Sequence, residues 1–258
     1  DSGSNKEKII ESCEEFEKEG IKIIIGPMDS KFLKELQKFE DLIFLSLSNI
    51  DSNINKNVLG MGINLESQLI ALKKFVTKEK KNKTIILYPD NEYTKHVEKN
   101  IKSVNFENSR LFKYNQDPKI LTKQIEKITN YKQRKTNLNS RIKKLEGSEE
   151  PKDIRELNKL KQKYTLGKIN FDSVIIIDFG DNLKSILTSL AYTDVSEKNV
   201  LIMTVNQWFD NSILEESSIK NFYFPSINLK NFEKYKKKFS KTYNYQPSEI
   251  TILAYDSI

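Results

Sequence analysis

The chain has 258 residues, of which 37% are hydrophobic and 31% are charged, so it can build hydrophobic cores beneath a heavily charged surface. No run of about 18 apolar residues occurs, which excludes a membrane-spanning helix of the usual length. The net charge of +7 favours acidic partners, but lysine dominates without arginine clusters or interleaved aromatics, so nucleic acid is not indicated.

Short apolar strands alternate with amphipathic helices in the first part of the chain. The stretch 21–25 is too short for a stable helix and rich in isoleucine, which is typical of a strand buried on both faces. Gly26 and Pro27 end this strand, and Asp29 or Ser30 is placed to cap the next helix. We expect, in order, a helix at 5–19, a strand at 21–25, a helix at 30–39, a strand at 42–46, an edge strand at 58–63 and a helix at 65–77.

The alternation starts again after the lysine-rich stretch 78–83, which we interpret as a crossing between lobes. We expect strands at 84–88, 109–114, 172–178, 199–204 and 221–224, helices at 92–103, 118–128, 181–191 and 230–243, and a last element at 248–258. Alternating strands and helices predict parallel, helix-covered sheets. The fold class is therefore α/β with two Rossmann-like lobes, one formed by 1–79 plus 245–258 and the other by 80–244.

Residues 129–167 interrupt this alternation, because they show helical spacing of apolar residues without a strand. Gly147 and Pro151 separate two halves, which predicts a helical hairpin inserted in the second lobe. The first half carries only basic charges (Lys132, Arg134, Lys135, Arg141, Lys143 and Lys144). A solvated helix face is the default interpretation of such a run, although a long insertion in a compact domain is more often functional than idle.

The sequence lacks the usual signatures of catalysis, such as a Gly-x-Ser-x-Gly elbow or a glycine-rich phosphate loop. His96, the sole histidine, falls in the middle of a helix, where an exposed position is expected, and Cys13, the sole cysteine, fits the buried stripe of a helix. Asp178 and Asp181 follow a strand, but two carboxylates alone do not specify acid–base catalysis. We therefore expect a protein that is not an enzyme, with no cofactor and no metal.

Polar residues at strand ends and helix starts form the candidate binding site. In an open parallel sheet these positions face one crevice, and two lobes with facing crevices make a clamshell that closes around a small polar molecule. The candidates are Ser30, Ser46, Ser48, Asn49, Tyr93, Asp181, Asn206 and Gln207. For Ser30 and Asp181, helix capping is the alternative role.

Four segments of this pattern resemble type I periplasmic binding proteins of the branched-chain amino-acid receptor type. They are Lys22-Ile-Ile-Ile-Gly-Pro-Met-Asp-Ser30, Phe44-Leu-Ser-Leu-Ser-Asn49, Tyr88-Pro-Asp-Asn-Glu-Tyr93 and Ala254-Tyr-Asp256. The resemblance covers most of the chain and keeps the order of its elements. It implies a two-lobed clamshell that lacks the first strand and helix of the first lobe, with the loops carrying Ser30, Ser48, Asn49 and Tyr93 along the cleft.

Two departures from this family concern the ligand. Amino-acid-binding members hold the ligand's ammonium with an acidic residue after a late strand of the second lobe, and by the resemblance that place is Asn206 here. The pair of small residues that grips the carboxylate is Ser48-Asn49. A zwitterionic amino acid is therefore a poor fit, because its ammonium would lack a compensating charge in a closed cleft.

The resemblance implies a non-enzymatic solute receptor of an ABC importer, with a small polar molecule and a membrane permease as partners. The insertion supports an alternative. Segments 128–135, 157–160 and 164–167, with Leu138, Leu145 and Phe171-Asp172, resemble the insertion of proteobacterial penicillin-binding-protein activators. Those lipoproteins share the fold and stimulate peptidoglycan synthases without a transported ligand. Either function implies export to the bacterial periplasm, with the signal peptide and any lipid anchor encoded outside this chain.

Overall fold

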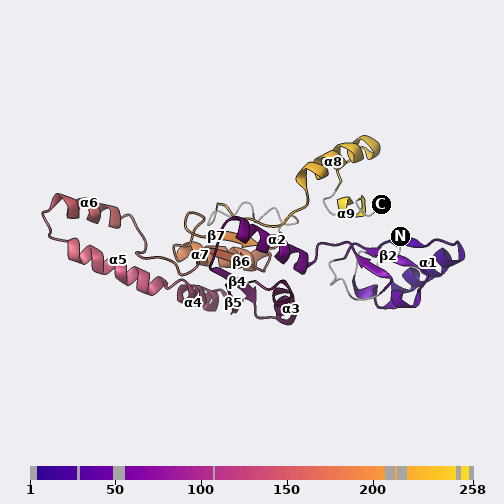
Figure 1. Cartoon of the computed structure of the whole chain (residues 1–258), viewed down its shortest axis with the longest axis horizontal. Helices are drawn as coiled ribbons and strands as arrows, with labels where there is room; N and C mark the ends of the chain where they lie inside the picture. The colour runs from indigo at the N-terminus through magenta and orange to yellow at the C-terminus, as the bar shows by residue number, and fades with distance from the viewer. Residues whose placement is uncertain are drawn as a thin grey trace. The chain divides into compact units, whose positions relative to one another are not determined.

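The computed structural model describes residues 5–27, 30–48, 56–106, 108–206, 213, 220–247 and 251–255. The chain divides into two compact units, the first formed by residues 1–68 and 226–258 and the second by residues 69–225 (Figure 1). These boundaries differ from the expected divisions at 79/80 and 244/245. Most of helix α2 (Leu65–Lys78) falls in the second unit, and helix α8 (Leu229–Tyr243) falls in the first. The predicted division into lobes at 79/80 and 244/245 stays a prediction.

The sheet of the first unit has three parallel strands in the order β1, β2, β3. Their bounds are β1 (Ile23–Ile25), β2 (Ile43–Ser46) and β3 (Val58–Gly60). Ile24 pairs with Phe44, and Phe44 pairs with Val58, so these three side chains lie on one face of the sheet. They pack with Ile9, Ile10 and Cys13 of helix α1 (Lys6–Lys18) in the core of this unit.

The predicted helix at 30–39 was wrong in type, because this stretch forms two short 3₁₀ segments, η1 (Ser30–Phe32) and η2 (Glu35–Lys38). Leu33, Leu36 and Phe39 are buried in the core, and their spacing of three residues fits the three-residue turn of a 3₁₀ helix. The side chain of Asn57 donates to the carbonyls of Leu36, at 3.2 Å, and Phe39, at 2.9 Å. These carbonyls are thus satisfied by a distant residue rather than by a further helical turn.

The second unit contains a parallel sheet in the order β5, β4, β6, β7. Its strands are β4 (Thr84–Pro89), β5 (Ser109–Tyr114), β6 (Ser173–Ile176) and β7 (Leu201–Thr204). Every residue of β4 and β6 is buried, as expected for central strands covered on both faces. The stretch predicted as a strand at 221–224 contributes a single bridge, between Tyr223 and Met203.

The strand order determines which helices share a face of this sheet. The chain passes from β4 to β5 in one direction and then from β5 across to β6 and β7 in the other. Because such crossovers are right-handed, α3 (Thr94–Val104) lies on one face, and α4 (Pro118–Ile128) and α7 (Gly180–Tyr192) lie on the opposite face. The chain reverses direction between β4 and β6, where ligands bind in many open α/β sheets.

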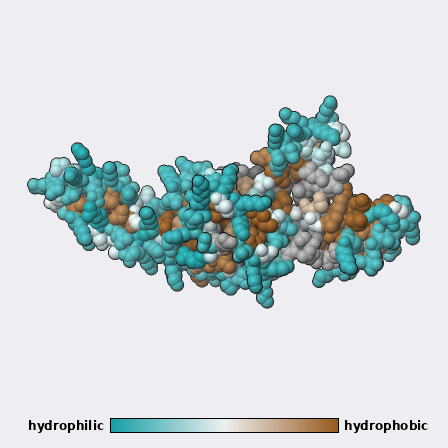
Figure 2. Space-filling model, in the orientation of Figure 1, coloured by the Kyte–Doolittle hydropathy of each residue, from teal (hydrophilic) through white to brown (hydrophobic). Residues whose placement is uncertain are grey.

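The predicted insertion is a helical hairpin between α4 and β6. It consists of α5 (Tyr131–Leu145) and α6 (Pro151–Leu160), and we call these two helices the hairpin. Leu138, Leu145 and Leu160 are buried between the helices, with Ile142 and Leu157 against them. The visible surface of the hairpin is largely hydrophilic (Figure 2).

Helices α8 and α9 (Thr251–Tyr255) form a separate aromatic cluster in the first unit. Phe232, Tyr235 and Ile252 are its buried members, and the hydroxyl of Tyr235 lies 2.9 Å from that of Thr251. None of the helices in the described part of the chain has both the length and the apolar character needed to cross a bilayer.

Candidate functional site

The carboxyl end of β2 holds two of the predicted cleft residues in one hydrogen-bonded group. The hydroxyls of Ser46 and Ser48 lie 2.6 Å apart, and both side chains are buried. The hydroxyl of Ser46 donates to the carbonyl of Pro27 at 3.0 Å, and the backbone N–H of Ser48 donates to the oxygen of Ser46 at 3.3 Å.

The direction of these bonds determines what Ser48 can offer a ligand. When Ser46 donates its only proton to Pro27, the Ser48 hydroxyl donates to Ser46. Ser48 then keeps acceptor lone pairs but no free proton. It is suited to a ligand group that donates a hydrogen bond and poorly suited to a carboxylate.

Three further candidates lie in separate connections of the second unit. Tyr93 immediately precedes α3 and is 62% exposed, with its backbone N–H bonded to Asn91. Asp181 lies in the first turn of α7 with a fully exposed side chain, 3.7 Å from the amine of Lys184. Asn206 lies two residues beyond β7 and is buried. Whether these residues bind a ligand stays a prediction.

The remaining candidates cannot be placed as side chains. Ser30 begins η1, but its side chain lies outside the described residues, as do Asn49 and Gln207. Of the candidate residues, the structure therefore describes the side chains of Ser46 and Ser48 in the first unit and those of Tyr93, Asp181 and Asn206 in the second.

The structure adds a buried pair at the reversal point of the second sheet, formed by Tyr114 and Asp178. The hydroxyl of Tyr114, at the end of β5, donates to the carboxylate of Asp178, which follows β6. The other carboxylate oxygen accepts the backbone N–H of Phe179 at 2.8 Å. Burial, and then the adjacent Asp178, raise the pKa of Tyr114. This pair occupies the place where a sheet of this order would present catalytic or ligand-binding groups.

The other residues considered for catalysis are in unsuitable surroundings. Cys13 is buried, and burial raises the pKa of its thiol to about 11, so it stays protonated at neutral pH. His96 is exposed on α3, as predicted, and no group of three or more potential metal ligands occurs among the residues that the structure describes.

Arg134 corrects one sequence-based interpretation, because it is buried rather than part of a solvated helix face. It is 4% exposed and donates to the carbonyls of Thr129, at 3.3 Å, and Thr193, at 3.1 Å. It also donates to the hydroxyl of Thr165 at 2.6 Å and lies 3.5 Å from the carboxylate of Asp194. Burial lowers the pKa of Arg134, an effect that Asp194 opposes.

These contacts attach the base of the hairpin to the second unit. Thr129 follows α4, Thr193 and Asp194 follow α7, and Thr165 lies in the segment returning from α6. The backbone carbonyl of Arg134 also accepts the N–H of Leu166 at 3.0 Å, which brings the two ends of the hairpin together. The hairpin is thus fixed in position at its base rather than joined by a free linker.

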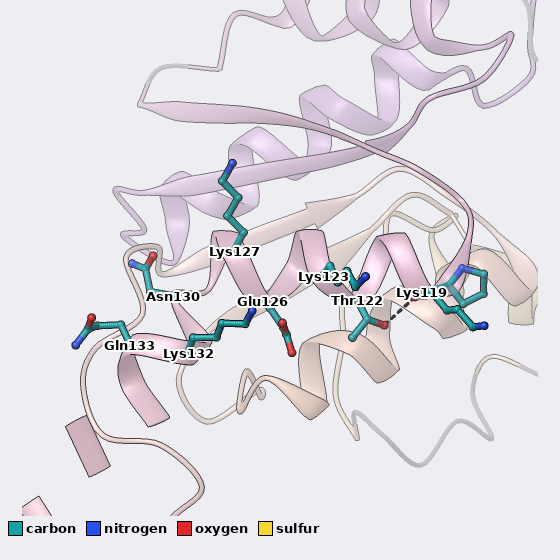
Figure 3. A pocket seen from close by; sticks show the side chains of 9 residues that line it. Lys119, Thr122, Lys123, Glu126, Lys127, Asn130, Lys132 and Gln133 are labelled. Carbon is teal, nitrogen blue, oxygen red and sulfur yellow. Dashed lines mark hydrogen bonds between the residues drawn. The ribbon is translucent and has the colours of Figure 1, made fainter. Parts of the chain in front are cut away.

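A shallow groove of about 1100 Å³ lies beside this base, along α4 and the first turn of α5 (Figure 3). Lys119, Lys123, Lys127 and Lys132 line it together with one acidic residue, Glu126. We call this feature the lysine groove. The lysine groove was not predicted from the sequence, although the four-residue spacing of Lys119, Lys123 and Lys127 places them on neighbouring turns of one side of a helix.

No family model matches the sequence, and no curated protein matches it. Solved structures do match the fold. Full-length LpoA from Haemophilus influenzae superposes over 98% of this chain with a TM-score of 0.57 and 12% identity, and this chain spans 41% of LpoA.

The chain has the type I periplasmic binding protein fold. The C-domain of the same LpoA, described as a regulator of PBP1A, gives a TM-score of 0.55 at 12% identity over 98% of this chain and 70% of its own. A branched-chain amino acid ABC transporter periplasmic ligand-binding protein from Burkholderia xenovorans gives 0.56 at 11% identity, over 100% of this chain and 63% of its own. The fold is thus shared by a transport receptor and a regulator, and neither of these proteins is described as an enzyme.

Proposed function

We propose that this chain is a non-enzymatic domain that regulates a peptidoglycan synthase by protein–protein contact. The observation that carries the proposal is the hairpin, which has its own small core and is fixed to the second unit through Arg134. A buried arginine with several hydrogen bonds holds this added element in place. Such rigid support is expected for an element that presents a binding surface in a defined position.

The identity of the partner rests on two likenesses. The sequence of the insertion resembles that of penicillin-binding-protein activators, and LpoA, which shares the fold, is described as a regulator of PBP1A. Both point to a synthase of the bacterial cell wall. The proposed location is accordingly the periplasm.

The described candidate residues give less support to an amino-acid receptor. With Ser46 donating to Pro27, Ser48 has no free proton for a ligand carboxylate, and by the resemblance Asn206 stands where amino-acid-binding members have the acid that holds the ammonium. A solute receptor remains the second candidate because hydroxyl and amide side chains do lie at strand ends in both units. Its ligand would be a small polar molecule with hydrogen-bond donors, delivered to a membrane permease.

The test is to compare the intact chain with a variant in which residues 137–162 are replaced by a short Gly–Ser linker. The Arg134 carbonyl and the Leu166 N–H are hydrogen-bonded, so the ends of the deletion are already close and the base contacts stay in place. Regulation predicts that the intact chain binds a synthase ectodomain from the same organism and raises its activity, and that the deletion abolishes both effects. Equal activity of the two proteins would reject the hairpin as the regulatory element.

A further inference from the structure

The lysine groove is a surface of concentrated positive charge next to the hairpin base. Lys119, Lys123 and Lys127 follow one another at four-residue spacing on α4, which places their Cα atoms about 6 Å apart along the helix axis. Lys132, in the first turn of α5, is the fourth lysine that lines the groove. The opposite side of α4 carries Leu121, Ile125 and Ile128, which are buried in the core of the second unit.

Lys119, Lys123, Lys127 and Lys132 form no ion pair within the described part of the chain, so their charges are not neutralised there. Glu126 is the only carboxylate among the lining residues, and it has no ion pair there either. Within the hairpin, by contrast, Arg141 of α5 pairs with Glu156 of α6 at 2.8 Å. Four closely spaced positive charges with a single carboxylate among them favour an acidic binding partner.

We propose that the lysine groove binds an acidic segment of the partner protein, an inference that rests on the proposed regulatory function. The complementary segment carries acidic side chains at similar spacing, as on one face of a helix with acids at every fourth position. A basic side chain of the segment would meet Glu126. The groove, rather than the hairpin tip, is then the electrostatic centre of the contact.

The lining residues favour a protein segment over other polyanions. Glu126 would repel a uniform chain of phosphates or sulfates, whereas a protein segment can place a basic residue opposite it. Among the described residues that line the groove, none is an arginine for bidentate phosphate contacts and none has an aromatic ring for stacking on bases. Pro118 is the only apolar residue in this described lining, so the groove presents no cluster of large apolar side chains of the kind that membrane-binding helices insert into lipid.

The experiment uses the full chain with two variants that lose the same four positive charges. The groove variant is K119Q/K123Q/K127Q/K132Q, and the control is K74Q/K78Q/K95Q/K102Q, whose lysines are exposed on α2 and α3 outside the groove. One probe is a synthetic helical peptide with glutamates at three positions four residues apart and one lysine between them. A second peptide of the same composition has its glutamates distributed around the helix.

In the peptide arm, we expect the groove variant to bind the patterned peptide at least about tenfold more weakly than the intact chain, while the control changes less than about twofold. The distributed peptide should bind more weakly than the patterned one, and added salt should weaken binding. Equal binding of the patterned peptide by the groove and control variants overturns the inference. Preferential binding of heparin or phosphatidylglycerol vesicles over the peptide also overturns it, in favour of a polyanion or membrane site.

In the synthase arm, the same variants are titrated with the synthase ectodomain beside the hairpin deletion. Loss of synthase binding in the groove variant, with normal binding by the control variant, supports the inference. Loss on hairpin deletion with normal binding by the groove variant overturns the inference and leaves the proposed function standing. No binding of the synthase by the intact chain rejects the proposed function, and the peptide arm then decides separately whether the groove recognises acidic segments.

Discussion

Replacing Arg134 with alanine should release the base of the hairpin. In the folded chain this guanidinium bridges four segments, because it reaches the residues after α4 and after α7, the return from α6, and its own helix α5. Alanine removes all of these bonds at once. It also leaves the carbonyls of Thr129 and Thr193, both in fully buried residues, without this donor.

The size of the effect follows from the burial of these groups. A hydrogen bond from a charged donor contributes about 1.5–3 kcal/mol, and an unsatisfied buried acceptor costs about 1–3 kcal/mol. The Asp194 contact adds less, because its carboxylate is 36% exposed and 3.5 Å away. We expect Arg134→Ala to destabilise the second unit by about 3–5 kcal/mol, as for other buried pairs that lose one partner.

The assay combines urea unfolding with hydrogen exchange of α5 in the folded chain. We expect faster exchange across the first turns of α5 and a lower urea midpoint. Arg134→Lys should recover part of the stability, because it keeps the charge without the planar fork of donors. Arg141→Ala is the matched control, since Arg141 lies on the same helix in an exposed pair with Glu156, and it should change little. A loss below about 1 kcal/mol for Arg134→Ala, with unchanged exchange in α5, would refute the role given to this residue.

Three further variants test other parts of the structure. Tyr114→Phe should destabilise the second unit by about 1–3 kcal/mol, because Asp178 loses a buried donor, and urea unfolding at neutral pH measures this loss. The pKa of the Cys13 thiol is raised to about 11 in the folded chain, so the folded state favours the protonated thiol. The stability that this contributes is fully present below the unfolded pKa and is lost as pH rises from about 9 to 11. Cys13→Ala should therefore flatten the curve of unfolding free energy against pH in this range. Asn57→Ala should cost about 1–2 kcal/mol in the first unit by removing the donors to the 3₁₀ segment, and an unchanged urea midpoint would contradict that role.

The fold was predictable because its strands are short and apolar and its helices are amphipathic. The strands at 84–88 and 109–114 and the hairpin were predicted on this basis. Local pattern and burial agree in the central strands of the second unit, whereas β1, expected to be buried on both faces, exposes Ile23 and Ile25. The stretch 30–39 was predicted less well. Within ten residues, apolar spacing hardly separates a period of 3.0 from 3.6, and the donor that satisfies its carbonyls, Asn57, lies far away in the sequence.

Buried Arg134 and the buried Tyr114–Asp178 pair show why sites are harder to predict than folds. Arg134 was grouped with neighbouring basic residues, yet Tyr131, Arg134 and Leu138 fall on one stripe of α5, which indicates burial. Asp178 was recognised as lying at a strand end. Tyr114 likewise ends the predicted strand at 109–114, but its pairing with Asp178 was not predicted. The two residues are 64 positions apart in the sequence, and their strands, β5 and β6, lie on either side of β4.

The central claim is that this domain works through a protein partner held at the hairpin and its base. The most direct measurement is a titration of the synthase ectodomain with the intact chain and with the variant lacking residues 137–162, followed by a thermal-shift screen of the intact chain with small polar solutes. The account predicts saturable synthase binding that the deletion abolishes, and no solute that raises the melting temperature. Absence of synthase binding, together with a saturable rise in melting temperature for one class of solute, would contradict it and identify a solute receptor.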